Sequence, residues 1–392
     1  MKKSYIVSAQ RTPMGSFGGA LKGFEAPQLG SMAITGALTA AGISPEVVEE
    51  VLFGNVCQAN LGQAPARQAA LGAQIPNTVP ATTINKVCSS GMKSVMFAAQ
   101  AIALGQADII VAGGMESMSN VPYYAPKLRW GNKYGGVNLV DGLQKDGLTD
   151  AYDHQAMGHC GDATAIKYGF SREDQDGYAI RSYERAAAAT TKGLFENEIT
   201  AVSIPQRKSD PIVMTEDEEY KNVRFDKIPK LRPAFNKDGT ITAANASTLN
   251  DGAAALVIAS EDAVKRYNLT PMAEIISYAD AAHEPQWFTT APTIAAPKAL
   301  SRAGIKMTDV DLFEVNEAFS AVAMAFAKTC NISEDIMNIN GGAVSMGHPL
   351  GCSGARIITT LVHALQQKEK QIGLATLCNG GGGASAIVIK AI

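Results

Sequence analysis

The chain of 392 residues lacks any long apolar run. No stretch reaches the roughly 18 apolar residues that a membrane span requires, and the apolar segment near the start, Tyr5-Ile6-Val7, is too short for a signal sequence. The start does not resemble a transit peptide either. We therefore expect no membrane partner and a cytoplasmic location, or a mitochondrial one if a leader has been removed.

A marked excess of charge of either sign is also missing. The 34 Lys and Arg residues nearly balance the 37 Asp and Glu residues, which gives a formal net charge of -3. A balanced chain has no global attraction to nucleic acids or to anionic membranes. We expect no nucleic-acid partner, although the balance leaves room for local basic patches.

The sequence has no paired cysteine framework and no Cys-x-x-Cys motif. Its six cysteines are spread over the whole chain, at Cys57, Cys88, Cys160, Cys330, Cys352 and Cys378. Such spacing is typical of reduced thiols in a reducing compartment and argues against a disulfide scaffold or a zinc site.

What the chain does have is enough apolar and small residues for a large packed core. Hydrophobic residues make up 46% of it, and it contains 37 glycines. A chain of this length and composition buries one large core or two medium ones, and glycine permits close approach of helices, strands and ligands.

Two segments far apart in the chain are similar to each other. Ala37–Ile43 and Ala299–Ile305 each predict an amphipathic helix closed by a glycine. Each is followed by a strand, a helix that small residues open, and a second strand that leads into glycines. The first strands are expected at 51–56 and 310–315, the helices at 88–104 and 352–365, and the second strands at 108–112 and 373–377.

This alternation predicts an α/β fold of two similar halves packed together, with the active site between them. Residues 119–250 differ in composition from both halves and are interpreted as an inserted lid or ligand-binding subdomain; a solvated surface excursion is the alternative. We expect one half from 1–118 together with 251–270, a loop domain at 119–250, and the second half at 271–392.

Four side chains form a candidate chemical site. Cys88 stands where a helix begins, and the free N–H groups and dipole of a helix N-terminus favour the thiolate; a small buried residue is the alternative. His348 lies in a glycine-rich run and is a candidate general base. Cys378 ends a predicted strand before glycines whose N–H groups can bind an oxyanion, and its thiol can transfer protons to and from carbon. Asn316 can donate from its amide or cap the following helix.

Taken together, the segments around these residues resemble the four signatures of the thiolase family. They are Val87-Cys88-Ser89-Ser90-Gly91, Asn316-Glu317-Ala318-Phe319, Gly347-His348-Pro349 and Cys378-Asn379-Gly380. The resemblance covers the whole chain in the right order and is strongest to the acetoacetyl-CoA thiolase branch of mitochondrial type.

The resemblance implies a five-layered αβαβα fold of two βαβαβαββ halves with a loop domain. It also implies a condensation of two acetyl-CoA to acetoacetyl-CoA and CoA, and the reverse thiolysis, with no redox cofactor. Cys88 would carry the acetyl group, His348 would activate Cys88, and Cys378 would move the proton on the second substrate. One oxyanion hole would comprise His348 and an Asn316-bound water, the other the Cys88 and Gly380 N–H groups.

Further positions follow from the resemblance alone. Contacts to CoA would come from Met157, Tyr183, Asn222, Val223, Arg224, Lys227 and Ser247, and a potassium ion would be bound at Tyr183, Ala243, Ala244, Ala246 and Val344. The family's usual histidine before the pocket methionine is Ala156 here, which removes a polar contact. A homotetramer, a dimer of dimers, is implied, joined through a loop that carries Lys127, Arg129, Trp130 and Lys133.

Other functions are compatible with parts of this pattern. A degradative 3-ketoacyl-CoA thiolase would accept longer acyl chains and would need a roomier pocket. A non-catalytic acyl-CoA carrier would not need two thiols and an imidazole together. A metal centre of Cys88, Cys378 and His348 is the remaining alternative.

Overall fold

The computed structural model describes residues 2–392, and Met1 lies outside it. A ten-stranded mixed sheet runs through the molecule in the order β12-β13-β14-β11-β1-β10-β5-β3-β4, with β2 (Gly15–Ser16) paired to β10. The two ends of this order correspond to the two halves of the sequence. Within the sheet, the two halves meet at the antiparallel pair β1 and β11. Only Tyr5↔Glu274 and Ile6↔Ala273 are paired there, so few strand hydrogen bonds join the two halves of the sheet.

The first half follows the expected βαβαβαββ order. It consists of β1 (Ser4–Arg11), α1 (Ala26–Ala41), β3 (Glu50–Gly54), α2 (Pro65–Gly72), β4 (Ala81–Ile84), α3 (Ser90–Ala103), β5 (Ile109–Ser117) and β10 (Asn250–Ser260), followed by α6 (Glu261–Arg266). β3 pairs in parallel with β4 and β5, and β10 pairs antiparallel with β1 and β5. The predicted glycine stop of the first helix is confirmed, since Gly42 caps α1 at φ 65°.

The second half repeats this order with one difference. It consists of β11 (Ala273–Ala282), α7 (Pro292–Ala303), β12 (Leu312–Val315), α8 (Ser320–Cys330), α9 (Ala343–Met346), α10 (Leu350–Gln367), β13 (Ile372–Asn379) and β14 (Gly383–Ala391). In place of a third strand there is one isolated bridge, Phe313↔Met337. The Asn338 side chain bonds both the N–H and the carbonyl of Val315, at 2.8 Å each, and so takes the place of further ladder bonds.

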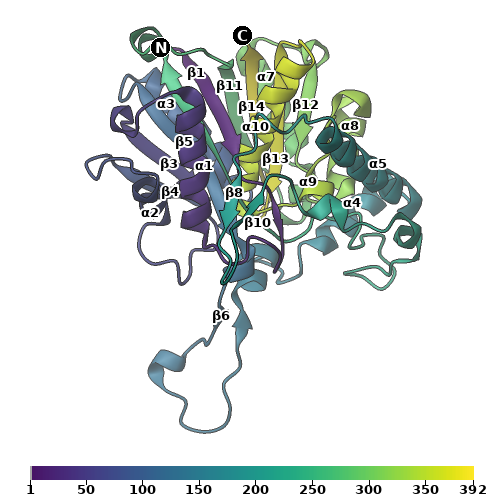
Figure 1. The fold of residues 1–392 in the computed structure, drawn as a ribbon. Helices are drawn as coiled ribbons and strands as arrows, with labels where there is room; N and C mark the ends of the chain where they lie inside the picture. The colour runs from purple at the N-terminus through teal and green to yellow at the C-terminus, as the bar shows by residue number, and fades with distance from the viewer. Residues whose placement is uncertain (1) are drawn as a thin grey trace.

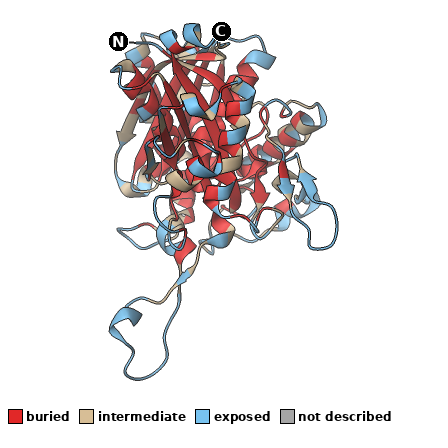
Figure 2. Cartoon of the chain, turned by 60° about the vertical axis from the view of Figure 1, so that its left-hand side comes forward, coloured by how far each residue is buried: buried red, intermediate tan, exposed pale blue. Residues whose placement is uncertain are grey.

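Helices cover the sheet in the expected αβαβα order. α1 and α2 pack on one outer face, α7 and α8 on the other, and α3 and α10 lie between the halves (Figure 1). The central layer is buried: α10 is inaccessible along nearly its whole length, and Figure 2 shows the buried residues concentrated in the two halves. Within residues 2–392 no helix is long and apolar enough to cross a membrane.

The region between the halves has two structurally different parts. α4 (Gly158–Tyr168) and α5 (Arg172–Thr191) pack beside the second half, where α5 contacts α8 and α9. The segment joining β6 (Tyr123–Tyr124) to β7 (Val140–Asp141) projects away from the body as an exposed arm (Figures 1 and 2). A small hairpin, β8 (Val202–Ile204) with β9 (Ile212–Met214), follows α5.

A buried ion network fastens this middle region to the first half. Arg11 of β1 is fully buried and donates to Glu198 at 2.6 Å and to both oxygens of Asp217 at 2.6 and 2.9 Å. Asp217 also accepts from the Met14 N–H at 2.8 Å. Removing one partner of such a network leaves an unpaired buried charge, which is costly. The network therefore holds Asp217 in place, and the segment that follows Asp217 is anchored at this residue.

The central layer depends on glycines where α10 packs against α3 and against β5. A Cβ atom at Gly354 would lie 2.4 Å from the backbone nitrogen of Met92, and one at Gly114 would lie 1.9 Å from the carbonyl oxygen of Gly351. Neither neighbour is a flexible side chain. The two halves therefore approach as closely as they do only because these positions lack a side chain.

We predict that Gly354→Ala lowers the free energy of unfolding by about 1–3 kcal/mol, because the added methyl group forces α3 and α10 apart. Gly177→Ala is the matched control, since Gly177 lies in α5 with nothing within 4 Å of the added atom, and alanine there should stabilise by about 0.5–1 kcal/mol. Urea unfolding measures both. Equal stability of Gly354→Ala and the wild type would contradict the packing argument.

Candidate active site

Cys88 lies in a strained turn between β4 and α3. Val87 has φ 49°, a left-handed conformation that is unfavourable for a β-branched residue. Side chains from both sides hold the turn: the Val87 N–H donates to Asn85 at 3.0 Å, and the Ser90 hydroxyl donates to the Val87 carbonyl at 2.6 Å. The turn therefore fixes the Cys88 sulfur, which is 8% exposed, at the boundary between the halves.

The segment after β13 meets this turn from the second half. The Gly380 backbone N–H lies close enough to Cys88 to oppose the rise in the pKa of its thiol, and the Ser89 hydroxyl donates to Asn379 at 2.9 Å. A Cβ atom at Gly380 would lie 3.4 Å from Met157 and 3.7 Å from Val87. The predicted oxyanion donor thus lies against the predicted nucleophile.

The two predicted thiols are close enough to affect each other. Cys378 is fully buried at the end of β13, among Phe319, Ala318 and Ala246. Burial raises the pKa of its thiol well above the ordinary value, and the neighbouring Cys88 sulfur adds to the rise. Cys378 is therefore a neutral thiol in the free protein.

His348 presents one nitrogen as a base. Its Nδ1 lies 2.6 Å from the Ser353 hydroxyl, which itself donates to the Pro349 carbonyl at 2.9 Å. Since that hydroxyl uses its proton on Pro349, it accepts from Nδ1–H, and Nε2 carries the lone pair. Burial, with the Arg356 charge, lowers the pKa of His348 to about 3, so the ring is neutral.

Asn316 completes the group beside His348. It follows β12, where its N–H donates to Thr376 at 3.0 Å, and its side-chain nitrogen lies 3.5 Å from Nε2 of His348. Its side-chain oxygen is buried with no partner among residues 2–392, so it is free to accept from a water or a substrate. The alternative that Asn316 caps a helix is wrong, because α8 begins at Ser320 with Phe319 as its N-cap.

The expectation that the helix N-terminus stabilises a Cys88 thiolate is wrong for the free protein. Burial raises the pKa of Cys88 to about 11, although hydrogen bonds from the Gly380 and Cys88 N–H groups act in the opposite direction. α3 begins two residues later, at Ser90. Burial raises the pKa of the Cys378 thiol in the same way.

A cavity of about 270 Å³ opens beside His348. Its walls are mostly apolar and include two of the predicted CoA contacts, Met157 and Ser247, together with His348. The Ser247 hydroxyl donates to the Ala318 carbonyl at 3.0 Å and keeps its lone pairs for a ligand. Ala156 also lines the cavity, so the missing histidine leaves this part of the wall without a polar group.

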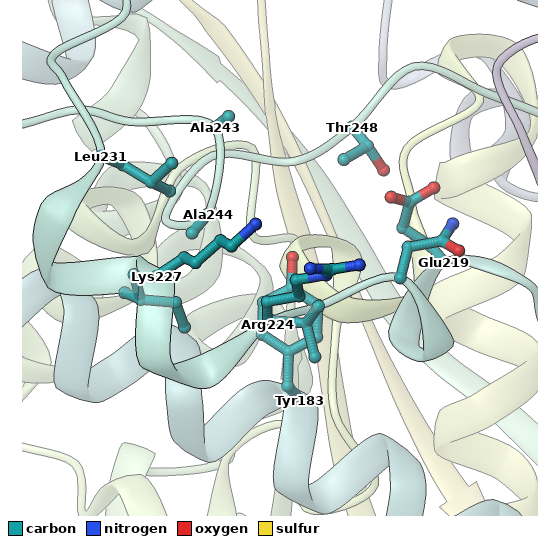
Figure 3. Close-up of a pocket in the computed structure, with 11 residues that line it drawn as sticks. Tyr183, Glu219, Arg224, Lys227, Leu231, Ala243, Ala244 and Thr248 are labelled. Carbon is teal, nitrogen blue, oxygen red and sulfur yellow. The ribbon is translucent and has the colours of Figure 1, made fainter.

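A second, more open pocket continues outward from the cavity, and Thr248 lines both. The other five predicted CoA contacts line it: Tyr183, Asn222, Val223, Arg224 and Lys227. Figure 3 shows Lys227 and Arg224 reaching into it from the same side. Both cations lie close to the short turns Glu219–Lys221 and Phe225–Lys230, directly after the Asp217 anchor. The two pockets therefore adjoin at Thr248, with exposed cations lining the outer one and His348 lining the inner one.

The predicted potassium ligands lie close together, with one exception. Tyr183 packs against Val344 and lines the outer pocket with Ala243 and Ala244, whereas Ala246 lines the inner cavity. A phenol and backbone carbonyls are hard oxygen ligands of the kind that alkali cations prefer. Among residues 2–392 no cluster of three or more His, Cys, Asp or Glu side chains could hold a metal ion.

Two positioning groups were not predicted from the sequence. Ser353 fixes the tautomer of His348, and its spacing of five residues from the histidine on a helix start could have indicated it. Glu317 is buried and accepts from Tyr178 at 2.9 Å, Ser182 at 2.8 Å and the Val344 N–H at 3.0 Å. Its position next to Asn316 in the same motif could have indicated its role from the sequence.

We predict that the rate at which iodoacetamide alkylates Cys88 in the free protein rises about tenfold per pH unit from pH 7 to pH 10. The reason is that the thiolate is the minor form at every pH below a pKa of about 11. Mass spectrometry of the alkylated peptide measures the rate, and acetyl-CoA should slow it. A plateau at or below pH 8 would show a stabilised thiolate and contradict this reading.

The geometry agrees with comparisons to known proteins. The family descriptions "Thiolase, N-terminal domain" and "Thiolase, C-terminal domain" match residues 4–262 and 269–391. A cytosolic acetyl-CoA acetyltransferase of Gibberella zeae is 54% identical over 98% of both chains, and the mitochondrial acetyl-CoA acetyltransferase of Homo sapiens is 54% identical over 100% of this chain and 91% of its own. The crystal structure of a thiolase from Ascaris suum in complex with coenzyme A is 48% identical, superposes with a TM-score of 0.95 and covers 100% of both chains. The chain belongs to the thiolase family.

Proposed function

We propose that the protein is an acetyl-CoA C-acetyltransferase, which condenses two acetyl-CoA to acetoacetyl-CoA and CoA and also catalyses the reverse thiolysis. The observation that supports this most strongly is that His348 lines the inner cavity with Phe319 and Ala246, against which Cys378 packs, while Cys88 lies close enough to Cys378 to raise its pKa. The names of the relatives favour a short acyl chain over the broader range of a degradative 3-ketoacyl-CoA thiolase.

In the first half of the reaction, Cys88 is the nucleophile. Its thiol gives its proton to Nε2 of His348 as the sulfur attacks the carbonyl carbon of acetyl-CoA, so no free thiolate accumulates. The Cys88 and Gly380 N–H groups stabilise the oxyanion. The bond from carbon to the CoA sulfur then breaks, and Cys378 protonates the leaving CoA. The products are acetyl-Cys88, a Cys378 thiolate and protonated His348.

In the second half, the Cys378 thiolate removes a proton from the methyl group of another acetyl-CoA. Protonated His348 and a water on the free oxygen of Asn316 stabilise the enolate oxygen. The enolate carbon attacks the acetyl carbon on Cys88, and the Cys88 sulfur leaves with the proton of His348. Cys88, Cys378 and His348 return to their neutral forms, so atoms and protons balance over the cycle.

The two connected pockets give the CoA moiety an extended site. Arg224 and Lys227 are exposed cations suited to the nucleotide phosphates. Ser247 and Met157 lie where the narrow pantetheine arm would pass. We assign Tyr183, Asn222 and Val223 to the wall of the nucleotide site.

A potassium ion is part of the proposal. It would be held by the Tyr183 phenol and by carbonyl oxygens of Ala243, Ala244, Ala246 and Val344. A bound cation there would neutralise carbonyl dipoles and stiffen the wall of the nucleotide pocket, which the same tyrosine lines.

Assembly, location and domain division are further parts of the proposal. The exposed arm carries Lys127, Arg129 and Lys133 around Trp130, which is 83% exposed, and aromatic residues with cations are typical of interfaces. We propose that it joins dimers into a homotetramer. The relatives include cytosolic and mitochondrial enzymes, and we propose a cytoplasmic location. We propose that the chain divides into a first half of residues 1–118 with 251–270, a loop domain of residues 119–250 and a second half of residues 271–392.

Two serine variants test the function. Cys88→Ser should lose labelling by radioactive acetyl-CoA, because the acceptor sulfur is gone. Cys378→Ser should still be labelled, since CoA leaves without help more readily than a carbon acid loses its proton, but should lose acetoacetyl-CoA formation by about 100-fold or more. Loss of labelling in both variants would contradict the division of roles.

For the ion, we predict that potassium chloride raises Tm by about 2 °C over sodium chloride at equal ionic strength, because a ligand bound only by the folded state stabilises it. Tyr183→Phe should abolish the difference. Tyr220→Phe, which alters a half-buried tyrosine beside Tyr183, is the matched control. The same Tm in both salts would remove the ion from the proposal.

A further inference from the structure

A charged cluster lies behind the Cys88 turn, at the contact of the two halves. The Lys86 ammonium donates to Asp280 at 2.7 Å, to the Ser385 hydroxyl at 2.8 Å and to the Ala384 carbonyl at 3.3 Å. Asp280 also accepts from Lys93 at 2.7 Å and from the Ser385 hydroxyl at 2.7 Å. We call Lys86, Asp280, Ser385 and the Ala384 carbonyl the Lys86 clamp.

The clamp connects the two backbone segments that hold the Cys88 and Cys378 sulfurs. Lys86 begins the turn of the nucleophile, where it forms a bridge with Cys88 and its carbonyl accepts from the Ser89 N–H at 3.2 Å. Ala384 is the register partner of Cys378 in the β13–β14 pair. A single side chain therefore connects the turn that carries one thiol to the residue directly opposite the other.

The bonding of the clamp differs from that of an ordinary surface ion pair. An ammonium has three donors, and each finds a separate acceptor from the second half. The Lys86 and Asp280 side chains are only 27% and 34% exposed. Burial acts to raise the pKa of Asp280, but bonds from the two lysines and Ser385 lower it to about 2; burial lowers the pKa of Lys86, and its bond to Asp280 opposes that change. The pair is thus ionised at neutral pH and fixed in direction, whereas exposed pairs of long side chains are mobile and weak.

The Cys88 turn needs such an anchor. Val87, the residue between Lys86 and Cys88, is held at φ 49°, and a β-branched residue keeps this conformation only where its surroundings enforce it. The bonds from Asn85 and Ser90 hold the turn within the first half. They do not set its position against the second half, which the turn reaches through Lys86 and through the bond from the Ser89 hydroxyl to Asn379.

We propose that Lys86 is a positioning residue that sets the separation between the Cys88 and Cys378 sulfurs through the Lys86 clamp. The proposal rests on the proposed function, because the separation matters only if both thiols act in the same carbon–carbon bond formation. Formation of the carbon–carbon bond requires the acetyl carbon on Cys88 and the carbon that Cys378 deprotonates to be in contact, and a displacement of about 1 Å can cost 100-fold in rate. Acetylation of Cys88 depends less on this alignment, because CoA leaves without help from Cys378 more readily than a carbon acid loses its proton.

The test separates the two half-reactions in Lys86→Met, which keeps the length of the side chain without its donors. Rapid-quench labelling with acetyl-CoA measures acetylation of Cys88, and steady-state assays measure condensation. We expect acetylation within about threefold of wild type, and a fall in kcat for condensation of about 10-fold to 100-fold with little change in KM. Asp280→Asn, which changes the far end of the clamp, should show the same split.

Lys298→Met is the matched control. Lys298 is exposed and donates to the backbone carbonyl of Asp280 at 3.0 Å, so it contacts the same residue without reaching the Cys88 turn, and both steps should keep wild-type rates. Urea unfolding of every variant measures stability.

Equal kcat for Lys86→Met and Lys298→Met would overturn the proposal. So would an equal fall in acetylation and condensation that tracks a loss of unfolding free energy, because Lys86 would then be only structural. If Lys86→Met does not fold, wild-type condensation in Asp280→Asn would overturn it as well. A wild-type protein that forms no acetoacetyl-CoA would instead refute the proposed function.

Discussion

The close approach of the two halves across the central helix layer is the constraint on which the rest of the structure depends. α10 approaches α3 at Gly354 and β5 at Gly114 to backbone distance, because neither position carries a side chain. This approach brings the Cys88 turn of one half against the Gly380 segment of the other. Without it, the thiols, the imidazole and the oxyanion donors would belong to separate surfaces.

Burial of the site keeps its two thiols and its imidazole uncharged in the free protein. The pKa values of both thiols are raised and that of His348 is lowered, so charge forms only while a substrate is reacting. A Cys88 thiol that passes its proton to His348 during attack needs no preformed thiolate. The chemistry then depends on the distances between atoms, which the strained turn and the Lys86 clamp maintain.

The sequence indicated the repeated halves, the layer order and the residues of the site, because these depend on local pattern and on recognisable motifs. It did not indicate the pKa values, which depend on how much protein surrounds Cys88 and Cys378 once the halves are packed. The Arg11 network and the Lys86 clamp were also missed, since each joins residues far apart in the chain, such as Arg11 with Asp217 and Lys86 with Asp280. Nothing in either local segment indicates its partner.

The most direct test of the account is a crystal structure of the protein with bound CoA. We predict that the CoA sulfur lies in contact with the Cys88 and Cys378 sulfurs and with Nε2 of His348, while the phosphates lie beside Arg224 and Lys227. A structure in which CoA binds elsewhere, or in which the two thiols face different pockets with no common contact to its sulfur, would contradict the account.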